Sequence, residues 1–295
     1  MIGWAGPLFW PYAYDDFVDY TFHPYAYDTF WPNAYDDVYE NMFGRYAYGS
    51  GGAYASVRQP PSVAAGGAGV RATDLCTGQT AGLTDWPIER IAQAVEPNDE
   101  QRAALDEFKD AAARALDSLK ASCPTELPST PTGRLAAMHQ RLDAILQSVR
   151  TVRPALEKFY QLLNDEQKAR FNALSPDETQ DLQSRRDLTQ ACGEHASGIG
   201  SLPIEQIERT VQPNEAQRAA FKELQDATAQ AVDLLKSNCP TYRALTPVVR
   251  LEAMEQRLAA MFQAVQTVEP ALEKFYGLLS TEQKERFNRL SPRQA

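Results

Sequence analysis

One offset governs most of this chain: residues 76–176 align without a gap on residues 192–292 when the sequence is shifted by 116 positions, and 56 of the 101 aligned positions are identical. The fragment TVRPALEKFYQLL at 151–163 returns as TVEPALEKFYGLL at 267–279. Self-similarity over this length indicates that one folding unit was copied in tandem. Whatever fold one copy adopts, the other must adopt too.

The apolar residues of each copy follow the spacing of α-helices. In the stretch that ends at Leu163 they alternate in steps of three and four, which is typical of helices packed lengthwise. Pro154 lies inside this stretch and predicts a kink or a break, because it removes one backbone hydrogen bond. No strand pattern follows residue 70, so we expect an all-α fold with four helices in each copy. The apolar positions are Leu135, Met138, Leu142, Ile145, Val149, Val152, Leu156, Phe159 and Leu163.

Four short polar motifs predict where helices begin. Each places Asn or Ser three positions before Gln, a spacing that lets the two side chains cap the first turn reciprocally. We therefore expect the four glutamines to be structural. The residues are Asn98 and Gln101, Asn164 and Gln167, Asn214 and Gln217, and Ser280 and Gln283.

Composition divides the chain into four parts. Residues 1–57 form an arm rich in aromatic residues and Asp, and residues 58–70 are a Gly, Ala and Pro linker. The first repeat takes residues 71–176 and the second takes residues 177–295. The two repeats either pack on each other or follow one another as separate bodies, and the sequence leaves both arrangements open.

The four cysteines obey the same offset as the repeats. Cys76 and Cys123 are 47 residues apart, and so are Cys192 and Cys239. Of the three possible connectivities, the duplication favours one disulfide inside each repeat, because a unit must have folded before it was copied. Disulfides imply an oxidising compartment such as the periplasm, although no signal peptide is visible in the chain. The alternative is four buried thiols in a cytosolic helical bundle.

With the preceding residue included, the polar motifs resemble the LTxxQ signature of the Spy/CpxP-like periplasmic proteins, and in particular the two-unit type of alphaproteobacteria. The resemblance implies an all-α, often dimeric, cradle-shaped protein that acts as an ATP-independent chaperone or as an envelope-stress or metal-responsive accessory protein. A tandem pair could then form a pseudo-dimer within one chain. The residues nearest to the signature are Leu279, Ser280 and Gln283, and Leu163, Asn164 and Gln167.

Groups suited to catalysis are scarce. The chain has three histidines, and no hydrolase, phosphate-loop or dinucleotide motif occurs. His139 and Asp143 share a helix face, but Glu255 and Ala259 stand at the matching positions of the second repeat, so we expect solvated surface there. We expect no enzymatic activity, no cofactor and no metal site. A solvated stripe, or a surface for acidic partners, is expected from Arg134, Arg141, Arg150 and Arg153.

The charge and hydropathy patterns exclude two classes of partner. The formal net charge is −10, and no basic patch of the kind that binds nucleic acid is present. No run of about 18 apolar residues occurs, so we expect no membrane-spanning helix.

The arm is the least ordinary segment. Within residues 1–48 lie 17 of the chain's 29 aromatic residues, interleaved with Asp and Pro. Such a segment either lays its rings on the helical repeats or on another copy, or serves as an adhesive arm for unfolded clients, a polysaccharide or a specific partner. The candidate contact residues are Trp10, Tyr12, Tyr14, Tyr25, Tyr27, Trp31 and Tyr35.

Two functions follow from these observations. The first is a periplasmic binding protein of the chaperone class, which holds unfolded clients on an amphipathic helical surface. The second is a structural or regulatory envelope protein, which binds a specific partner or polymer through the arm.

Overall fold

The computed structural model describes residues 88–122, 130–173, 204–238 and 246–288. These residues form helices joined by turns, with no strand among them, and the order of helices repeats, as the sequence predicts. The first repeat contributes α5 (Ile88–Val95), α6 (Asp99–Ala121), α7 (Pro131–Leu162) and α8 (Asp165–Asn172). The second contributes α10 (Ile204–Val211), α11 (Glu215–Ser237), α12 (Pro247–Gly277) and α13 (Thr281–Asn288).

Several predictions fall on residues outside these ranges. The aromatic arm, the linker and all four cysteines lie there, so the disulfide pairing remains a prediction. None of the described helices combines the length and apolar character needed to cross a membrane.

The two longest helices begin with the same device. The Thr130 hydroxyl accepts the Gly133 N–H at 3.1 Å, and Pro131 occupies the first helical position. The Thr246 hydroxyl accepts the Val249 N–H at 3.3 Å, followed by Pro247. Thr satisfies one of the free N–H groups of the first turn, and Pro has no N–H to satisfy. Both helix starts are therefore encoded locally.

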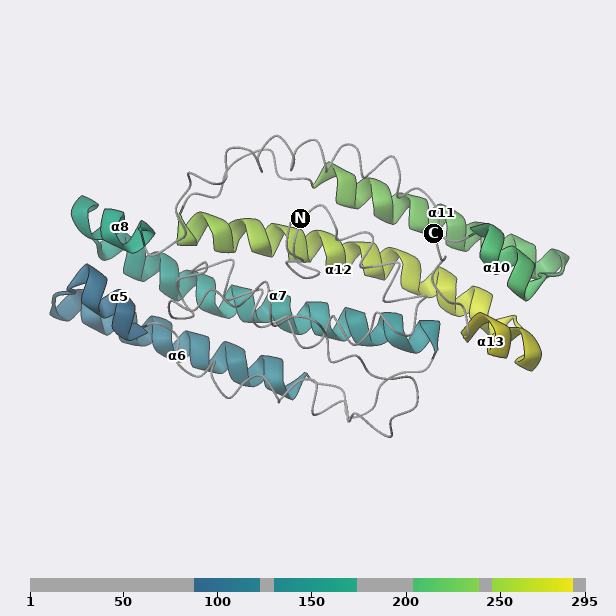
Figure 1. Cartoon of the computed structure of the whole chain (residues 1–295), viewed down its shortest axis with the longest axis horizontal. Coiled ribbons are helices and arrows are strands. Elements are labelled where there is room, and N and C mark those ends of the chain that lie inside the picture. Colours follow the sequence, from purple (N-terminus) through teal and green to yellow (C-terminus); the bar gives the residue numbers. More distant parts are fainter. Residues whose placement is uncertain (1–87, 123–129, 174–203, 239–245, 289–295) are drawn as a thin grey trace, which may run out of the picture.

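The four long helices lie in a row, in the order α6, α7, α12 and α11 (Figure 1). Each runs antiparallel to its neighbour, so the picture looks nearly the same after a half-turn. The short helices α5 and α8 pack together at one end of the row, and α10 and α13 do so at the other. The repeats are therefore joined side by side through α7 and α12, which decides between the two arrangements that the sequence leaves open.

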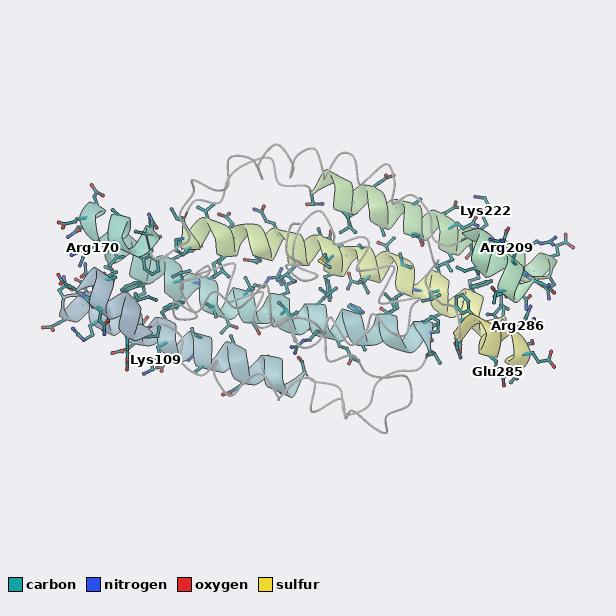
Figure 2. All side chains as sticks on the ribbon, viewed as in Figure 1. Lys109, Arg170, Arg209, Lys222, Glu285 and Arg286 are labelled. Carbon is teal, nitrogen blue, oxygen red and sulfur yellow. The ribbon has the colours of Figure 1, made fainter. Side chains whose placement is uncertain are left out.

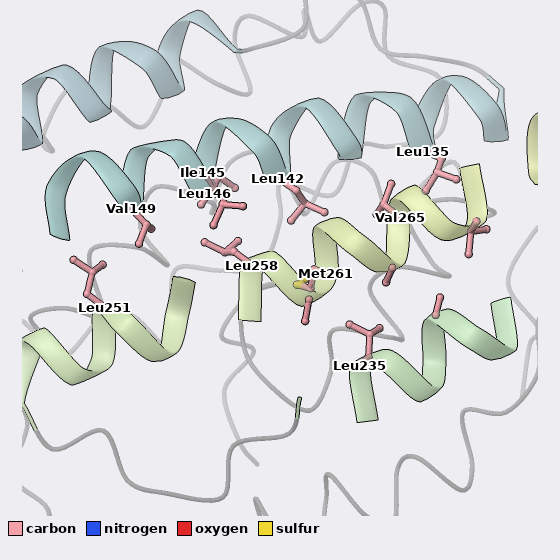
Figure 3. Close-up of a cluster of buried hydrophobic side chains, with 14 of the residues drawn as sticks. Leu135, Leu142, Ile145, Leu146, Val149, Leu235, Leu251, Leu258, Met261 and Val265 are labelled. Carbon is pink, nitrogen blue, oxygen red and sulfur yellow. The ribbon is translucent and has the colours of Figure 1, made fainter. Parts of the chain in front are cut away.

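The apolar positions predicted for α7 are buried wherever their side chains are described. Leu135, Leu142 and Phe159 are fully buried, and the matching positions of α12 are buried as well. Figure 3 shows the side chains of both helices converging on the junction, with Leu146 turned toward Leu258. One continuous core therefore runs through both repeats.

Of the kink or break predicted at Pro154, the break does not occur, because α7 continues through it to Leu162. Pro270 likewise lies inside α12. Proline costs a helix one hydrogen bond, but Val152 and Leu156 on either side of Pro154 are buried in the core. Burial of these side chains outweighs the missing bond.

We expect Leu258→Ala to lower the free energy of unfolding by about 2–5 kcal/mol, because it removes buried methyl groups and leaves a cavity at the junction. Urea unfolding followed by circular dichroism measures this loss. Leu278→Ala is the matched control, since Leu278 is 48 % exposed and its removal should change stability by about 0.5 kcal/mol or less. Equal losses in the two variants would contradict a core at the junction.

Candidate functional site

At one end of the row, the two motif glutamines of the first repeat bond to each other. Gln101 Nε2 donates to Gln167 Oε1 at 2.9 Å, and Gln167 Nε2 donates to Gln101 Oε1 at 2.9 Å. The residues are only 5 % and 6 % exposed. They are 66 positions apart in the sequence. This closed amide pair therefore fastens the start of α6 to the start of α8.

The remaining polar atoms of the pair also have partners. Each Oε1 accepts the backbone N–H of its own helix cap, at 3.0 Å and 3.1 Å. Gln101 Nε2 also donates to the Leu162 carbonyl at 2.8 Å, and Gln167 Nε2 donates to the Val95 carbonyl at 3.1 Å. A side-chain amide has two N–H donors and two lone pairs, and all of them are used here. The arrangement acts as a clasp between helix ends.

The same glutamines complete the capping boxes predicted from the sequence. Asn98 Oδ1 accepts the Gln101 N–H at 2.9 Å, and Asn164 Oδ1 accepts the Gln167 N–H at 2.8 Å. Each motif thus works twice, as a cap within its own helix and as half of the clasp.

The second repeat has the same clasp at the opposite end of the row. Gln217 and Gln283 exchange hydrogen bonds of 2.8 Å and 3.0 Å, with both caps in place. Their other N–H groups reach the carbonyls of Leu278 at 2.8 Å and Val211 at 3.0 Å. Gln283 is more exposed than its counterpart in the first repeat, so this clasp is the less protected of the two.

A residue in the left-handed region helps to form each clasp. Glu96 has φ 51°, and Pro97 follows it, so α5 cannot continue. The Val95 carbonyl is thereby free of the helix and accepts from Gln167. Gln212, at φ 52°, ends α10 in the same way.

Charged side chains line the junction of α7 and α12 near the end of α7. Arg153 lies 2.9 Å from Glu255 and 3.6 Å from Glu252, and Arg150 lies 3.0 Å from Glu255. Arg153 also bonds Glu157 of its own helix at 2.6 Å. Burial acts to raise the pKa of Glu255, but hydrogen bonds and charges from Arg153 and Arg150 lower that pKa below its ordinary value. The carboxylate is therefore held ionised between the repeats.

The interpretation of His139 as solvated surface is wrong. Its Nδ1 lies 2.7 Å from Glu269 Oε2, and its ring centroid lies 4.7 Å from that of Phe262 on the same helix of the second repeat. Its side chain is 27 % exposed. Asp143, which shares a face with it, instead accepts from Gln147 at 3.4 Å. His139 therefore belongs to the junction.

The expectation of a solvated arginine stripe is also wrong. Arg141 is 3 % exposed and donates to the Ser122 hydroxyl at 2.7 Å. Arg150 and Arg153 are bound across the junction. The side chain of Arg134 lies outside the described part. Arg141 is held beside the end of α6, whereas Arg150 and Arg153 face α12, so these residues do not form one stripe.

The outer surface of the described helices is largely charged. Among the side chains that the structure describes, Leu278 is the one large apolar side chain that is more than a third exposed. Among the described residues, no three His, Cys, Asp or Glu side chains come together as a metal site. Figure 2 shows charged side chains projecting from the row, including Lys109, Arg170, Arg209, Lys222, Glu285 and Arg286.

We expect Gln101→Ala to lower the free energy of unfolding by about 3 kcal/mol, because the Leu162 carbonyl, the Asn98 N–H and one N–H of the buried Gln167 amide lose their partners. Adding Gln167→Ala should cost less than the sum of the two single changes, since both break one clasp. Urea unfolding measures all three variants. Gln147→Ala on the exposed face of α7 is the control, and a loss in Gln101→Ala no larger than in that control would refute the clasp.

Stability should depend on the ionisation of Glu255. Its pKa is lower in the folded protein than in the unfolded chain, where it has the ordinary value of 4.5. Its contribution is therefore complete above the unfolded pKa and is lost as the pH falls through the folded pKa. Glu255→Gln should cost about 1 kcal/mol near neutral pH. The free energy of unfolding of the Glu255→Gln variant should also fall less steeply than that of the wild type as the pH is lowered. Parallel pH profiles would contradict the assignment.

Comparison with known proteins agrees with this repeated architecture. The family model described as "LTXXQ motif family protein" matches the chain twice, over residues 83–175 and 199–291. No curated protein and no solved structure matches the chain. Each match spans one set of four helices and includes both glutamines of its clasp. Since the two matches together cover more than half of the sequence, the chain belongs to the LTXXQ motif family.

Proposed function

We propose that this protein is a non-enzymatic, chaperone-like binding protein of the periplasm that holds partly unfolded proteins without ATP. The family is typically periplasmic and generally non-enzymatic. The observation that carries the proposal is the union of two family repeats into one row of helices (Figure 1).

The dimensions of the row suit this role. Helices α7 and α12 contain 32 and 31 residues, so each is about 48 Å long at 1.5 Å per residue. A surface of this length contacts an extended client at several points at once. The charges that project from the helices speed its capture, and reversible contact allows its release.

A second candidate function is favoured by the distribution of apolar side chains. The large apolar side chains that the structure describes are mostly buried in the core, and Leu278 is the exposed one among them. Apolar contact with a partner would then come from the arm, whose aromatic residues include Trp10, Tyr12 and Trp31. In this alternative the helical body is a scaffold, and the arm binds one specific envelope protein or polymer.

Suppression of client aggregation by the oxidised protein separates the two functions. The full chain and residues 58–295 are compared at ratios from substoichiometric to equimolar. Equal suppression by both places the clients on the helical body, and suppression by the full chain alone places them on the arm. The absence of suppression by either would refute the chaperone proposal. A pull-down from envelope extract with residues 1–57 then tests the specific-partner alternative, and recovery of no partner would refute it.

A further inference from the structure

Two polar side-chain pairs in the junction, His139 with Glu269 and Arg153 with Glu255, join equivalent positions of the two repeats. The offset of 116 places His139 on Glu255 and Arg153 on Glu269. The structure pairs His139 with Glu269 and Arg153 with Glu255. Each pair therefore joins the same two positions, with the roles of the repeats exchanged, as in a two-fold symmetric interface.

The charges at these positions are not symmetric. In both pairs the first repeat supplies the basic residue and the second repeat supplies the carboxylate. The neighbouring positions divide in the same way. Arg150 of the first repeat corresponds to the neutral Gln266, and Glu252 of the second corresponds to the neutral Ala136. The first repeat thus carries the basic edge of the junction, and the second carries the acidic edge.

The apolar part of the junction makes no such distinction. Leu135, Leu142 and Val149 of α7 correspond to Leu251, Leu258 and Val265 of α12. All six are buried, and Figure 3 shows them along the two facing helices. Because the two apolar stripes match at these positions, they would accept a like repeat from another chain nearly as well as the second repeat of their own.

The charged residues of the junction disfavour pairing between two like repeats. Two first repeats would bring Arg153 and Arg150 against His139, which offers them no carboxylate. Two second repeats would bring the carboxylates of Glu255 and Glu252 against that of Glu269. The residues of the Arg153 pairs are 20–39 % exposed, so water screens them only in part. Like charges at these distances repel, and they work against the wrong partner as much as opposite charges favour the right one.

We propose that the charged edges of the junction select the partner: the first repeat pairs with the second repeat of the same chain, and like-with-like pairing between chains is rejected. The protein is then a self-contained particle of one chain. The apolar stripes supply the attraction. The five charged residues Arg150, Arg153, Glu252, Glu255 and Glu269, together with His139, supply the choice.

The test exchanges the edges using residues that the other repeat already carries. Variant A gives the first repeat the acidic edge through A136E, H139E, R150Q and R153E. Variant B gives the second repeat the basic edge through E252A, E255H, Q266R and E269R. Variant C combines all eight changes and restores complementarity with the roles reversed. The full chain is used throughout, with urea unfolding and light scattering as readouts.

The wild type and variant C should both have the mass of one chain. The unfolding equilibrium constant should rise on the order of tenfold or more in A and in B, and return to within about threefold of the wild type in C. The rescue in C should shrink at high salt. If A and B are too unstable to purify, the stability of C still decides. The proposal would be overturned if the unfolding equilibrium constant rose in C by the product of the factors seen in A and B. A wild-type mass of two chains would overturn it as well.

Discussion

The packing of α7 against α12 is the constraint on which the remaining structure depends. Each of these helices must cover apolar side chains on two flanks, because one flank meets its own repeat and the other meets its counterpart. A single repeat would leave the second flank in water. Since burial of apolar area is the main favourable term in folding, pairing of the repeats is part of the fold rather than an addition to it.

The clasps and the junction perform different tasks along this row. Apolar contact is strong but tolerates sliding, and matched stripes on α7 and α12 do not by themselves define a register. The clasps fix the ends of each repeat, because the amide pairs Gln101 with Gln167 and Gln217 with Gln283 close only in one arrangement of the helix starts. The charged edges then fix which surfaces meet. Polar groups provide the geometry, and apolar groups provide the stability.

Whether the sequence predicts a residue's role correctly depends on how far along the chain its interaction partner lies. Asn164 and Gln167 cap a helix within four residues, so the sequence predicts them correctly. Pro154 carries a local penalty that burial of its neighbours outweighs, so the predicted break does not occur. His139 was interpretable only together with Glu269, 130 residues away, and its helical neighbour Asp143 was the wrong partner. The opposite charges at matching positions of the two repeats were the one available signal for this junction.

The sequence by itself determined the duplication, the all-α class, the starts of the helices and the apolar face of each long helix. The duplication is visible as identical residues at a fixed offset. The other features depend on residues a few positions apart. Only the tertiary structure decided that the repeats lie side by side, that the glutamines pair across 66 residues, and that Arg150 and Arg153 of α7 bind a carboxylate of α12. A periodic pattern shows which face of a helix avoids water. The element that covers that face depends on how the whole chain returns on itself, and no local spacing records it.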